Sequence, residues 1–472
     1  MKLSMIPAPE AIYYLEGFTK KTAKVIKRID SSLGREEFRI RIENVISITA
    51  ADEAGLFYAE NALEQIKFQC GMNLPNVYIQ DAPRYAYRAF MIDCCRHYFG
   101  VEELKTMITR CAKMRFNVFH WHLTDDQGWR PEIKAYPELV ETGSVRHGSN
   151  FAEEQNNDDY SGHFTREQME EVIEFAHRHH MKVVPEIDMP GHASALLASL
   201  PHLVCGNKSV NIKTSPGIFN DIICAGSEKT YETLFTILDE ICDIFPDEYI
   251  HLGGDEAPKG QWKSCPCCQK RIKDENLEGE EALQGYFINR ITEHLESKGR
   301  KVITWNESLK SGNLKDSVIV ERWMDPKKLA VNSPNKIIVS DFYHMYADYP
   351  YAMTPVSKVY NYNTKLNGNV IGTDIPIWTE YVRNMEYMEY MCFPRFIATA
   401  QDAWSRKKPS YSQFRTELEE LLPWFETGNH AKSSEWDPPS HSRLAGTLRH
   451  FMGINPVEQL KNLVKGKKEQ ES

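Results

Sequence analysis

The sequence predicts an α/β protein, with a (β/α)8 (TIM) barrel preceded by a small α+β domain. From about Arg88 onward, short apolar runs alternate with helical stretches, which is typical of parallel strands joined by helices. Eight such runs follow one another over about 330 residues, which is enough for a closed barrel with insertions. Before Arg88, apolar residues alternate with polar ones, as in the half-buried strands of a smaller sheet.

The segments can be assigned in order along the chain. Residues 1–83 contain the alternating stretches EEFRIRIE and VISITA, followed by DEAGLFYAENALEQIKFQ, which has the spacing of an amphipathic helix. The segment DAPRYAYR marks the boundary with the barrel, which we place at residues 84–425. Residues 426–472 are predicted to form a C-terminal helical extension with a frayed tail. The predicted barrel strands are AFMIDC, NVFHWHL, KVVPEID, YIHLGG, VITWNE, VIVERW, KIIVSDF and NVIGTDIPIW.

Composition and charge restrict the possible partners. The 472 residues are 42% hydrophobic and carry a formal net charge of −10, which disfavours nucleic-acid binding because such surfaces are basic. No run approaches the roughly 18 apolar residues of a membrane span, so we expect no membrane association. No signal-peptide pattern precedes the first domain, and the 11 cysteines are interpreted as mostly reduced thiols. We therefore expect a cytoplasmic protein, or a secreted one if a signal was trimmed; oligomeric state is not indicated.

Chemically active side chains are concentrated where the predicted strands end, which is where barrels place their catalytic groups. The central pair is Asp255 and Glu256 in HLGGDEAP, two adjacent carboxylates after a short apolar strand. Charged groups together with flat aromatic rings suit a polar, uncharged, ring-shaped substrate. The other candidates at these ends are Asp93, Arg96, Asp125, Asp126, Glu186, Asp188, His192, Trp305, Trp323, Tyr346, Asp348, Trp378 and Glu380.

Each candidate also has an ordinary structural explanation. An acidic pair can lie in a solvated loop or cap a helix, and a single Trp at a strand end is more often part of the core. Arg96 could simply neutralise neighbouring acids. His120 and His122 have the spacing of a metal site, but also of side chains that fill a barrel. Three Trp at three different strand ends are harder to explain as core alone.

The segment CPCC brings Cys265, Cys267 and Cys268 together. A structural zinc site needs four ligands in a tetrahedral arrangement, and no second Cys-x-x-Cys follows downstream to complete one. We therefore favour free thiols in an exposed loop over a zinc site, but the sequence alone does not decide whether this loop binds metal.

Several longer motifs resemble glycoside hydrolase family 20, the β-N-acetylhexosaminidases. The resemblance extends from about Arg84 to Trp404, and the preceding module resembles the small α/β domain found before the barrel in that family. The acidic pair, the His and Arg motifs and three Trp occur in the same order, which makes the resemblance specific. CPCC is not part of the general pattern. The motifs are YRAFMIDCCRHYFGVEEL, FNVFHWHLTDDQGWRPEIKAYPEL, VVPEIDMPGHASA, HLGGDEAPKGQW, WNE, WTEYV and RFIATAQDAW.

The resemblance implies roles for the catalytic residues. Glu256 would be the general acid/base that protonates the glycosidic oxygen, and Asp255 would orient and polarise the 2-acetamido group of the substrate. Tyr346 would hydrogen-bond the acetamido oxygen, and Asp125 with His192 would form a relay that tunes the acid/base. No cofactor or metal takes part in the reaction that the resemblance implies.

The resemblance also implies an oligosaccharide or glycoconjugate as the substrate. Arg96 and Glu380 would hold ring hydroxyls, and Asp348 would make a further hydroxyl contact. The aromatic walls that enclose the acetamido methyl and stack on the sugar would be Trp305, Trp323 and Trp378. The sequence does not distinguish GlcNAc from GalNAc, and it indicates neither linkage nor natural substrate.

The adjacency of Asp255 and Glu256 agrees with this mechanism. Retaining glycosidases normally hold two carboxyls about 5 Å apart across one glycosidic bond, whereas neighbouring residues of a strand point in opposite directions. The pair suits substrate-assisted catalysis, in which the acetamido oxygen of the substrate attacks the anomeric carbon. We expect a retaining exo-β-N-acetylhexosaminidase that removes terminal non-reducing β-linked GlcNAc or GalNAc.

Three other functions remain open on sequence grounds. A lacto-N-biosidase of the same family would release a disaccharide. A metal-dependent amidohydrolase would use His120 and His122 as ligands and would respond to chelators. A non-catalytic sugar-binding barrel would have no need of the acidic pair and would turn over no substrate.

Overall fold

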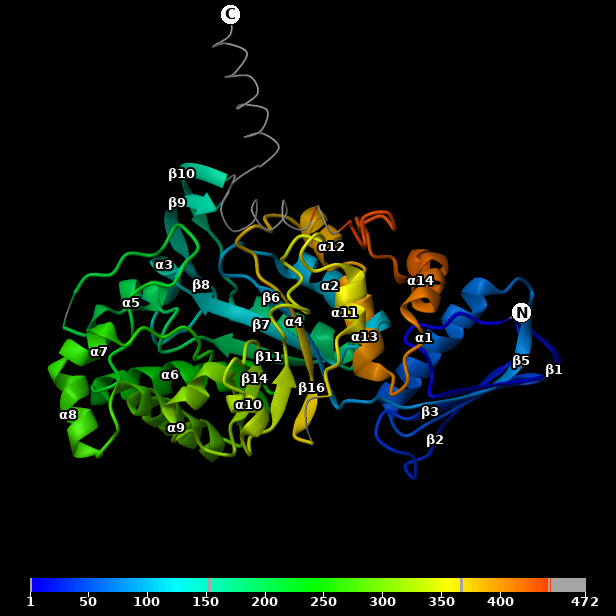
Figure 1. Ribbon diagram of the computed structural model, residues 1–472, viewed down its shortest axis with the longest axis horizontal. Helices are drawn as coiled ribbons and strands as arrows, with labels where there is room; N and C mark the ends of the chain where they lie inside the picture. The colour runs from blue at the N-terminus through cyan, green and yellow to red at the C-terminus, as the bar shows by residue number, and fades with distance from the viewer. Residues whose placement is uncertain (1, 152–153, 207, 366–367, 440–441, 443–472) are drawn as a thin grey trace, which may run out of the picture.

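Two units make up the protein: an N-terminal α+β domain, at the right of Figure 1, and the barrel beside it. The structure is a computed structural model, and it describes residues 2–151, 154–206, 208–365, 368–439 and 442. Of the predicted C-terminal extension, residues 426–439 form turns and irregular segments, and the tail from residue 443 lies outside the described residues. No helix in the described part of the chain has the length and apolar character needed to cross a bilayer.

The N-terminal domain is a five-stranded sheet in the order β1-β5-β3-β4-β2, with α1 packed against β3 and β4. In β3, Phe38, Ile40 and Ile42 are buried while the residues between them are not, which is the expected alternation. The N-cap Asp52 accepts a hydrogen bond from the Gly55 N–H at 2.8 Å and fixes where α1 begins. The elements are β1 (Ala11–Lys20), β2 (Val25–Ile29), β3 (Phe38–Glu43), β4 (Val45–Ala50), α1 (Glu53–Gln69) and β5 (Asn73–Asp81).

Eight parallel strands close into a barrel, because the last, β16, pairs with the first, β6. Each of the eight predicted apolar runs forms one of these strands, so the predicted fold class is confirmed. β6 and β7 are buried at every position, and β7 alternates core residues such as Trp121 with the buried polar residues His120 and His122. The strands are β6 (Tyr87–Asp93), β7 (Val118–Asp125), β11 (Lys182–Ile187), β12 (Tyr249–His251), β13 (Lys301–Trp305), β14 (Ile319–Arg322), β15 (Ile337–Val339) and β16 (Val370–Ile377).

Helices surround the barrel, and shorter elements are inserted between its units (Figure 1). The longer helices are α2 (Val101–Lys113), α4 (Arg166–Arg178), α6 (Glu228–Ile244), α9 (Glu280–Ser297), α13 (Arg395–Trp404) and α14 (Tyr411–Phe425). The inserted and shorter elements are β8 (Gly128–Trp129), α3 (Glu138–Glu141), β9 (Val145–Phe151), β10 (Glu154–Ser161), α5 (Ser194–Ser199), η1 (Pro201–Leu203), α7 (Gly260–Ser264), α8 (Pro266–Asp274), η2 (Asn306–Ser311), α10 (Leu329–Asn332), α11 (Val356–Asn361) and α12 (Met385–Cys392).

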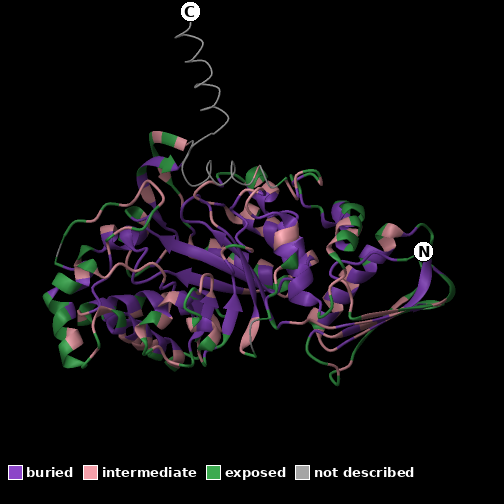
Figure 2. Ribbon diagram, in the orientation of Figure 1, coloured by how far each residue is buried: buried purple, intermediate pink, exposed green. Residues whose placement is uncertain are grey.

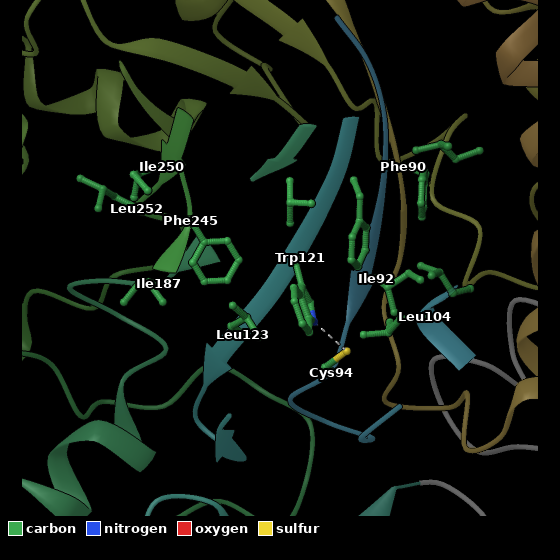
Figure 3. Packing of buried hydrophobic residues seen from close by; sticks show 14 of the residues in the cluster. Phe90, Ile92, Cys94, Leu104, Trp121, Leu123, Ile187, Phe245, Ile250 and Leu252 are labelled. Atoms are coloured by element: carbon green, nitrogen blue, oxygen red, sulfur yellow. Dashed lines mark hydrogen bonds between the residues drawn. The ribbon is translucent and has the colours of Figure 1, made fainter. Parts of the chain in front are cut away.

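The main apolar core lies between the barrel strands and the surrounding helices, where Figure 2 shows the strands buried. Trp121 of β7 is fully buried in this layer, and its ring stacks on that of Phe119 with centroids 5.5 Å apart. The Trp121 Nε1–H donates to the Cys94 sulfur at 3.3 Å, drawn as a dashed line in Figure 3. The indole therefore fills the layer without leaving its polar atom unsatisfied.

The barrel interior changes character along its axis. A small apolar cluster that includes Ala89, Val118 and Ile338 fills one layer. Another interior layer holds fully buried ionisable groups instead of the branched apolar side chains usual in such barrels; these are His120, His122, Glu186, His251, Glu321 and Asp374. Burying ionisable groups is costly unless they are paired, so this layer needs the specific contacts described below.

Candidate active site

One cavity collects most of the predicted site residues. It opens where β6, β11, β12, β14 and β16 end, as expected for a barrel. Nine of the eleven predicted catalytic and substrate-binding residues line it. The lining residues are Arg96, His192, Asp255, Glu256, Trp323, Phe342, Tyr346, Asp348, Tyr349, Trp378, Glu380 and Tyr381.

The acidic pair is carried by a turn and not by a strand. β12 ends at His251, and Gly253 and Gly254 then adopt positive φ angles of 61° and 96°. Glu256 itself has a φ of 41°, which is rare for a residue with a side chain. The prediction that Asp255 and Glu256 point apart, as neighbours on a strand do, is therefore wrong. The left-handed turn lets both carboxylates line the same cavity.

Close packing around this turn fixes its path. A Cβ on Gly253 would lie 1.8 Å from Oδ1 of Asp188, and that same oxygen accepts a hydrogen bond from the Gly254 N–H at 3.1 Å. The Glu256 N–H donates to Oε2 of Glu307 at 2.5 Å. The turn is thus held by the carboxylate that follows β11 and by one from η2, which fixes the position of the acidic pair.

His192 faces both carboxylates of the pair. Its Nε2 lies 3.8 Å from Oδ2 of Asp255 and 3.5 Å from Oε2 of Glu256. On the other side of the ring, Nδ1 lies 3.2 Å from Oδ1 of Asp125. Although burial opposes the charge, Asp125 raises the pKa of His192 well above its ordinary value. A cationic imidazole between the acids limits their mutual repulsion.

A chain of buried hydrogen bonds continues from His192 into the barrel. Asp125 contacts Nε2 of His122 at 2.9 Å, and Nδ1 of His122 contacts Glu186. Burial alone would raise the pKa of Asp125, but Arg96 and His192 hold that pKa well below its ordinary value. Asp125 is therefore an anion that links His192 at the cavity to the ionisable layer of the barrel, and its role as a relay stays a prediction.

Two carboxyl groups of the cavity, those of Asp255 and Asp348, have raised pKa values. Burial, opposed by His192 and reinforced by Glu256, raises the pKa of Asp255 to about 7. Asp348, which also lines the cavity, behaves similarly, because burial and the nearby Glu380 raise its pKa to about 8. These carboxyls have been removed from water in positions where a polar ligand can reach them, which is typical of functional sites.

Arg96 is held rigidly at the cavity wall. Its Nη2 lies 2.8 Å from Oδ2 of Asp125 and 3.9 Å from Oε1 of Glu380, and its Nε donates to Gln127 at 2.9 Å. The guanidinium also lies over the ring of Trp378, 5.0 Å from the centroid. Arg96 and Glu380 thus lie side by side at the cavity wall, and their binding of sugar hydroxyl groups stays a prediction.

Aromatic rings enclose the other side. Tyr346 lies 6.2 Å from Trp378 between ring centroids, and Trp323 packs edge-on against Phe342 at 5.7 Å. Trp305 was predicted to be a wall of the cavity, but it is 1% exposed and does not line the cavity. Its Nε1–H donates to Glu186 at 2.8 Å and its ring lies 6.0 Å from that of Trp378. Trp305 supports the wall from behind, as Asp125 supports His192.

Several buried polar atoms of the cavity have no hydrogen-bond partner within the described part of the chain. Buried groups in this state are uncommon in folded proteins and call for an explanation. Here they surround one cavity and combine acceptors with donors, as a ligand with both hydroxyl and amide groups would require. They are Oδ1 of Asp255, Oδ1 of Asp348, Nε2 of His192, Nε1 of Trp323 and Nε1 of Trp378.

Three lining residues were missed by the sequence analysis: Phe342, Tyr349 and Tyr381. Phe342 and Tyr349 flank Tyr346 in the aromatic stretch DFYHMYADY, and Tyr381 directly follows Glu380. The density of aromatic residues after the seventh strand was therefore a usable indication. Gln127, which supports Arg96, carried no comparable pattern.

His120 and His122, the ligands of the amidohydrolase alternative, are paired with carboxylates inside the barrel. His120 Nδ1 lies 2.9 Å from Asp374, and its Nε2 lies 3.2 Å from Glu186. Neither imidazole lines the cavity. They hold the buried acids of the ionisable layer together.

The expectation of an exposed CPCC loop is wrong for two of its three cysteines. The segment spans the junction of α7 and α8, where Cys265 and Cys268 are buried and Cys267 is exposed. The two buried thiols meet Cys205 and Cys224, which lie upstream and not downstream.

Comparisons with known sequences agree with this site. The model of the family described as glycosyl hydrolase family 20, catalytic domain, matches residues 85–407. A β-hexosaminidase of Porphyromonas gingivalis is 35% identical over 390 residues, which are 76% of this chain and 49% of that protein. A β-hexosaminidase of Vibrio furnissii is 30% identical over 420 residues, which are 82% of this chain and 68% of that protein. The chain spans about half the length of the first of these relatives.

Solved structures show the same architecture. A β-N-acetylhexosaminidase from Bacteroides fragilis matches with a TM-score of 0.82 at 30% identity, over 92% of this chain and 99% of that one. A family 20 exo-β-N-acetylglucosaminidase from Vibrio harveyi, solved in complex with N-acetylglucosamine, matches with a TM-score of 0.80 at 26% identity. The match covers 91% of this chain and 78% of that one. This coverage extends the likeness to the N-terminal domain as well as the barrel.

Proposed function

The chain belongs to glycosyl hydrolase family 20, and from this premise we propose that it is a retaining exo-β-N-acetylhexosaminidase using substrate-assisted catalysis. Its substrate would be an oligosaccharide or glycoconjugate ending in β-linked GlcNAc or GalNAc. The observation that carries the proposal is the acidic pair, since Asp255 and Glu256 both line one cavity and both face His192. A sugar-binding barrel without activity would have no use for two such carboxyls.

The first step forms a ring on the substrate itself. The acetamido oxygen attacks the anomeric carbon while Glu256, in its protonated form, gives its proton to the leaving glycosidic oxygen. The bond from the anomeric carbon to that oxygen breaks, and a cyclic oxazolinium ion forms, which keeps the hydrogen on its nitrogen. Because the nucleophile is tethered to the sugar, its effective concentration at the reacting carbon is high.

Asp255 acts on the acetamido nitrogen. As the oxygen attacks, the nitrogen gains positive charge, and the Asp255 carboxylate stabilises that charge through the nitrogen-bound hydrogen. Its Oδ1 is buried and has no hydrogen-bond partner among the described residues, so it is available for this contact. Tyr346 lines the same cavity and would donate its hydroxyl hydrogen to the acetamido oxygen.

The second step returns the anomeric centre to its starting configuration. Glu256, now a carboxylate, removes a proton from a water molecule that attacks the anomeric carbon, and the oxazolinium ring opens to restore the neutral acetamido group. Two displacements at one carbon give net retention. During both steps Arg96, Glu380 and Asp348 would bind the ring hydroxyls, while Trp378 and Trp323 would exclude water from the acetamido group.

A panel of chromogenic aryl glycosides tests the proposal. We expect turnover of the β-GlcNAc or β-GalNAc compound, and nearly none of the matched β-glucoside and β-galactoside even at saturation. An aryl lacto-N-bioside in the same panel separates the disaccharide-releasing alternative. Lack of turnover of every compound by folded protein would support the binding barrel instead.

A further inference from the structure

Four cysteines from three separate segments meet at the start of α8, at the outer edge of the barrel (Figure 1). We call them the four-cysteine cluster: Cys205, Cys224, Cys265 and Cys268. Each is at most 5% exposed, and their sulfurs all lie within 4.8 Å of one another. None of them lines the catalytic cavity. The cluster is therefore a second feature, independent of the proposed activity.

The spacing of the sulfurs is that of metal ligands. The Cys224 sulfur lies 3.8 Å from those of Cys265 and Cys268, and Cys205 lies 3.8 Å from Cys268. In a tetrahedral site with zinc–sulfur bonds of about 2.3 Å, neighbouring sulfurs are about 3.8 Å apart. A disulfide would require about 2.0 Å. Two packed thiols touch at a similar distance, so the observation that indicates a metal site is the convergence of four sulfurs within 4.8 Å of one another.

The backbone brings the ligands together from both sides. Val204 and Ile223 form an antiparallel bridge, and the Cys224 N–H donates to the Leu203 carbonyl at 2.8 Å. This bridge places Cys205 and Cys224 next to each other although 18 residues separate them in sequence. Trp262 of α7 donates its Nε1–H to the Ile223 carbonyl at 2.8 Å, which joins the bridge to the second pair of ligands.

The second pair comes from the first turn of α8. Cys265 is the N-cap residue and Cys268 lies three positions later, so both fall on one face of the helix, while Cys267 points outward and is exposed. Gly226 allows the close approach, because a Cβ there would lie 2.2 Å from the Cys267 carbonyl carbon. A side chain at this position would push α8 away from Cys224.

We propose that the four-cysteine cluster binds one Zn²⁺ ion through four thiolates. Binding would release the thiol protons, and the site is closed, because four protein ligands complete a tetrahedron and leave no position for substrate. The ion is therefore structural. It joins the loop after η1, the segment before α6 and the α7–α8 junction, which are also linked by the Val204–Ile223 bridge, by the Trp262 hydrogen bond and by the ion pair of Arg271 with Glu228.

The loop held by this site reaches the catalytic cavity. Between the first two ligands, the Lys213 N–H donates to the Asp126 carbonyl at 2.9 Å, and Gln127 donates to the Ser215 carbonyl at 3.0 Å. Gln127 in turn accepts from Nε of Arg96 at 2.9 Å. Fixing both ends of this loop would hold Arg96 in place from outside the cavity.

Metal content of the full-length protein is the first test. The protein is purified under reducing conditions without metal-affinity chromatography, and its zinc and iron are measured by inductively coupled plasma mass spectrometry. We expect about one zinc per chain, as for a closed four-cysteine site. Zinc far below stoichiometry, or iron in its place, would overturn the proposal.

A matched pair of variants assigns the ion to the cluster. Cys268→Ser should lose the bound zinc, whereas Cys267→Ser, one position away and exposed, should keep it. Equal zinc in both variants would contradict the assignment. Limited proteolysis gives a second readout, since loss of zinc should speed cleavage within residues 208–223.

If Cys268→Ser does not fold, an experiment on the wild-type protein tests the proposal instead. Titration of folded protein with an organomercurial should release its zinc to a chromogenic chelator as the cluster thiols react. Release of no zinc on complete thiol modification would contradict the proposal, as would detection of disulfides among these four cysteines in freshly purified protein.

Discussion

The imidazole Nε2 of His192 lies 3.8 Å from Oδ2 of Asp255, on the side of the ring opposite to Asp125. This contact connects the acidic pair to the buried ion network, so the charge state of His192 influences both catalytic carboxyls. Because Asp125 raises the pKa of His192 well above its ordinary value, the ring carries a positive charge at neutral pH. It therefore opposes the rise in the pKa of Asp255 that burial causes.

Glu256→Gln should lower turnover by about 10²–10⁴-fold, because an amide cannot protonate the leaving oxygen. The loss should be smallest for aryl glycosides with acidic leaving groups, which depart with little assistance. Steady-state kinetics on a series of aryl N-acetylglucosaminides measures this dependence. An equal loss for every leaving group would argue against Glu256 as the acid.

Asp255→Asn should reduce kcat strongly while leaving the fold intact, because the carboxylate stabilises charge that develops only in the transition state. Asparagine has nearly the same shape but no charge. Kinetics together with circular dichroism separate the two effects. Near-normal kcat would exclude the proposed role.

The same variant should change how stability depends on pH. Burial raises the pKa of Asp255 to about 7; the negative charge of Glu256 adds to this rise and the positive charge of His192 opposes it. An aspartate in the unfolded chain titrates near about 3.9. The contribution of this group is thus fully present below about pH 4 and is lost as the pH rises through about 7. As the pH is raised from about 4 to about 7, the thermal midpoint should therefore fall less for Asp255→Asn than for the wild type. Parallel profiles would mean that the pKa of Asp255 is not raised.

Gly253→Ala should destabilise the protein by at least about 2 kcal/mol and reduce activity. The residue has a φ of 61°, and its new Cβ would displace the Asp188 oxygen that holds Gly254. Gly260→Ala is the control, because nothing lies within 4 Å of a Cβ there. Chemical denaturation of both variants checks this, and similar stability would show that the turn is not constrained.

The barrel could be predicted because its strands are buried on both faces. β6 and β7 have no solvent side, so both contain buried aromatic and aliphatic residues throughout, and helical segments separate them from the next strands. The turn after β12 could not be predicted in the same way. The chain leaves the strand at His251, and the positive φ angles that follow depend on packing against Asp188 and Glu307.

The sequence also did not indicate which of the tryptophans at the strand ends would reach the cavity. Trp305 and Trp378 both occur at strand ends, but only Trp378 lines the cavity, because Glu186 and the ring of Trp378 hold Trp305 behind the wall. The four-cysteine cluster shows a similar limit. Cys265 and Cys268 form a recognisable motif, whereas Cys205 and Cys224 become neighbours only through the bridge between Val204 and Ile223.

The most direct test of the account is kcat for aryl β-N-acetylglucosaminides whose N-acetyl methyl carries zero, one, two or three fluorine atoms. Fluorine withdraws electrons from the acetamido oxygen and weakens it as a nucleophile, without changing the leaving group. If that oxygen attacks the anomeric carbon beside Asp255, kcat should fall progressively along the series. A kcat that does not depend on fluorination would contradict substrate-assisted catalysis at this site.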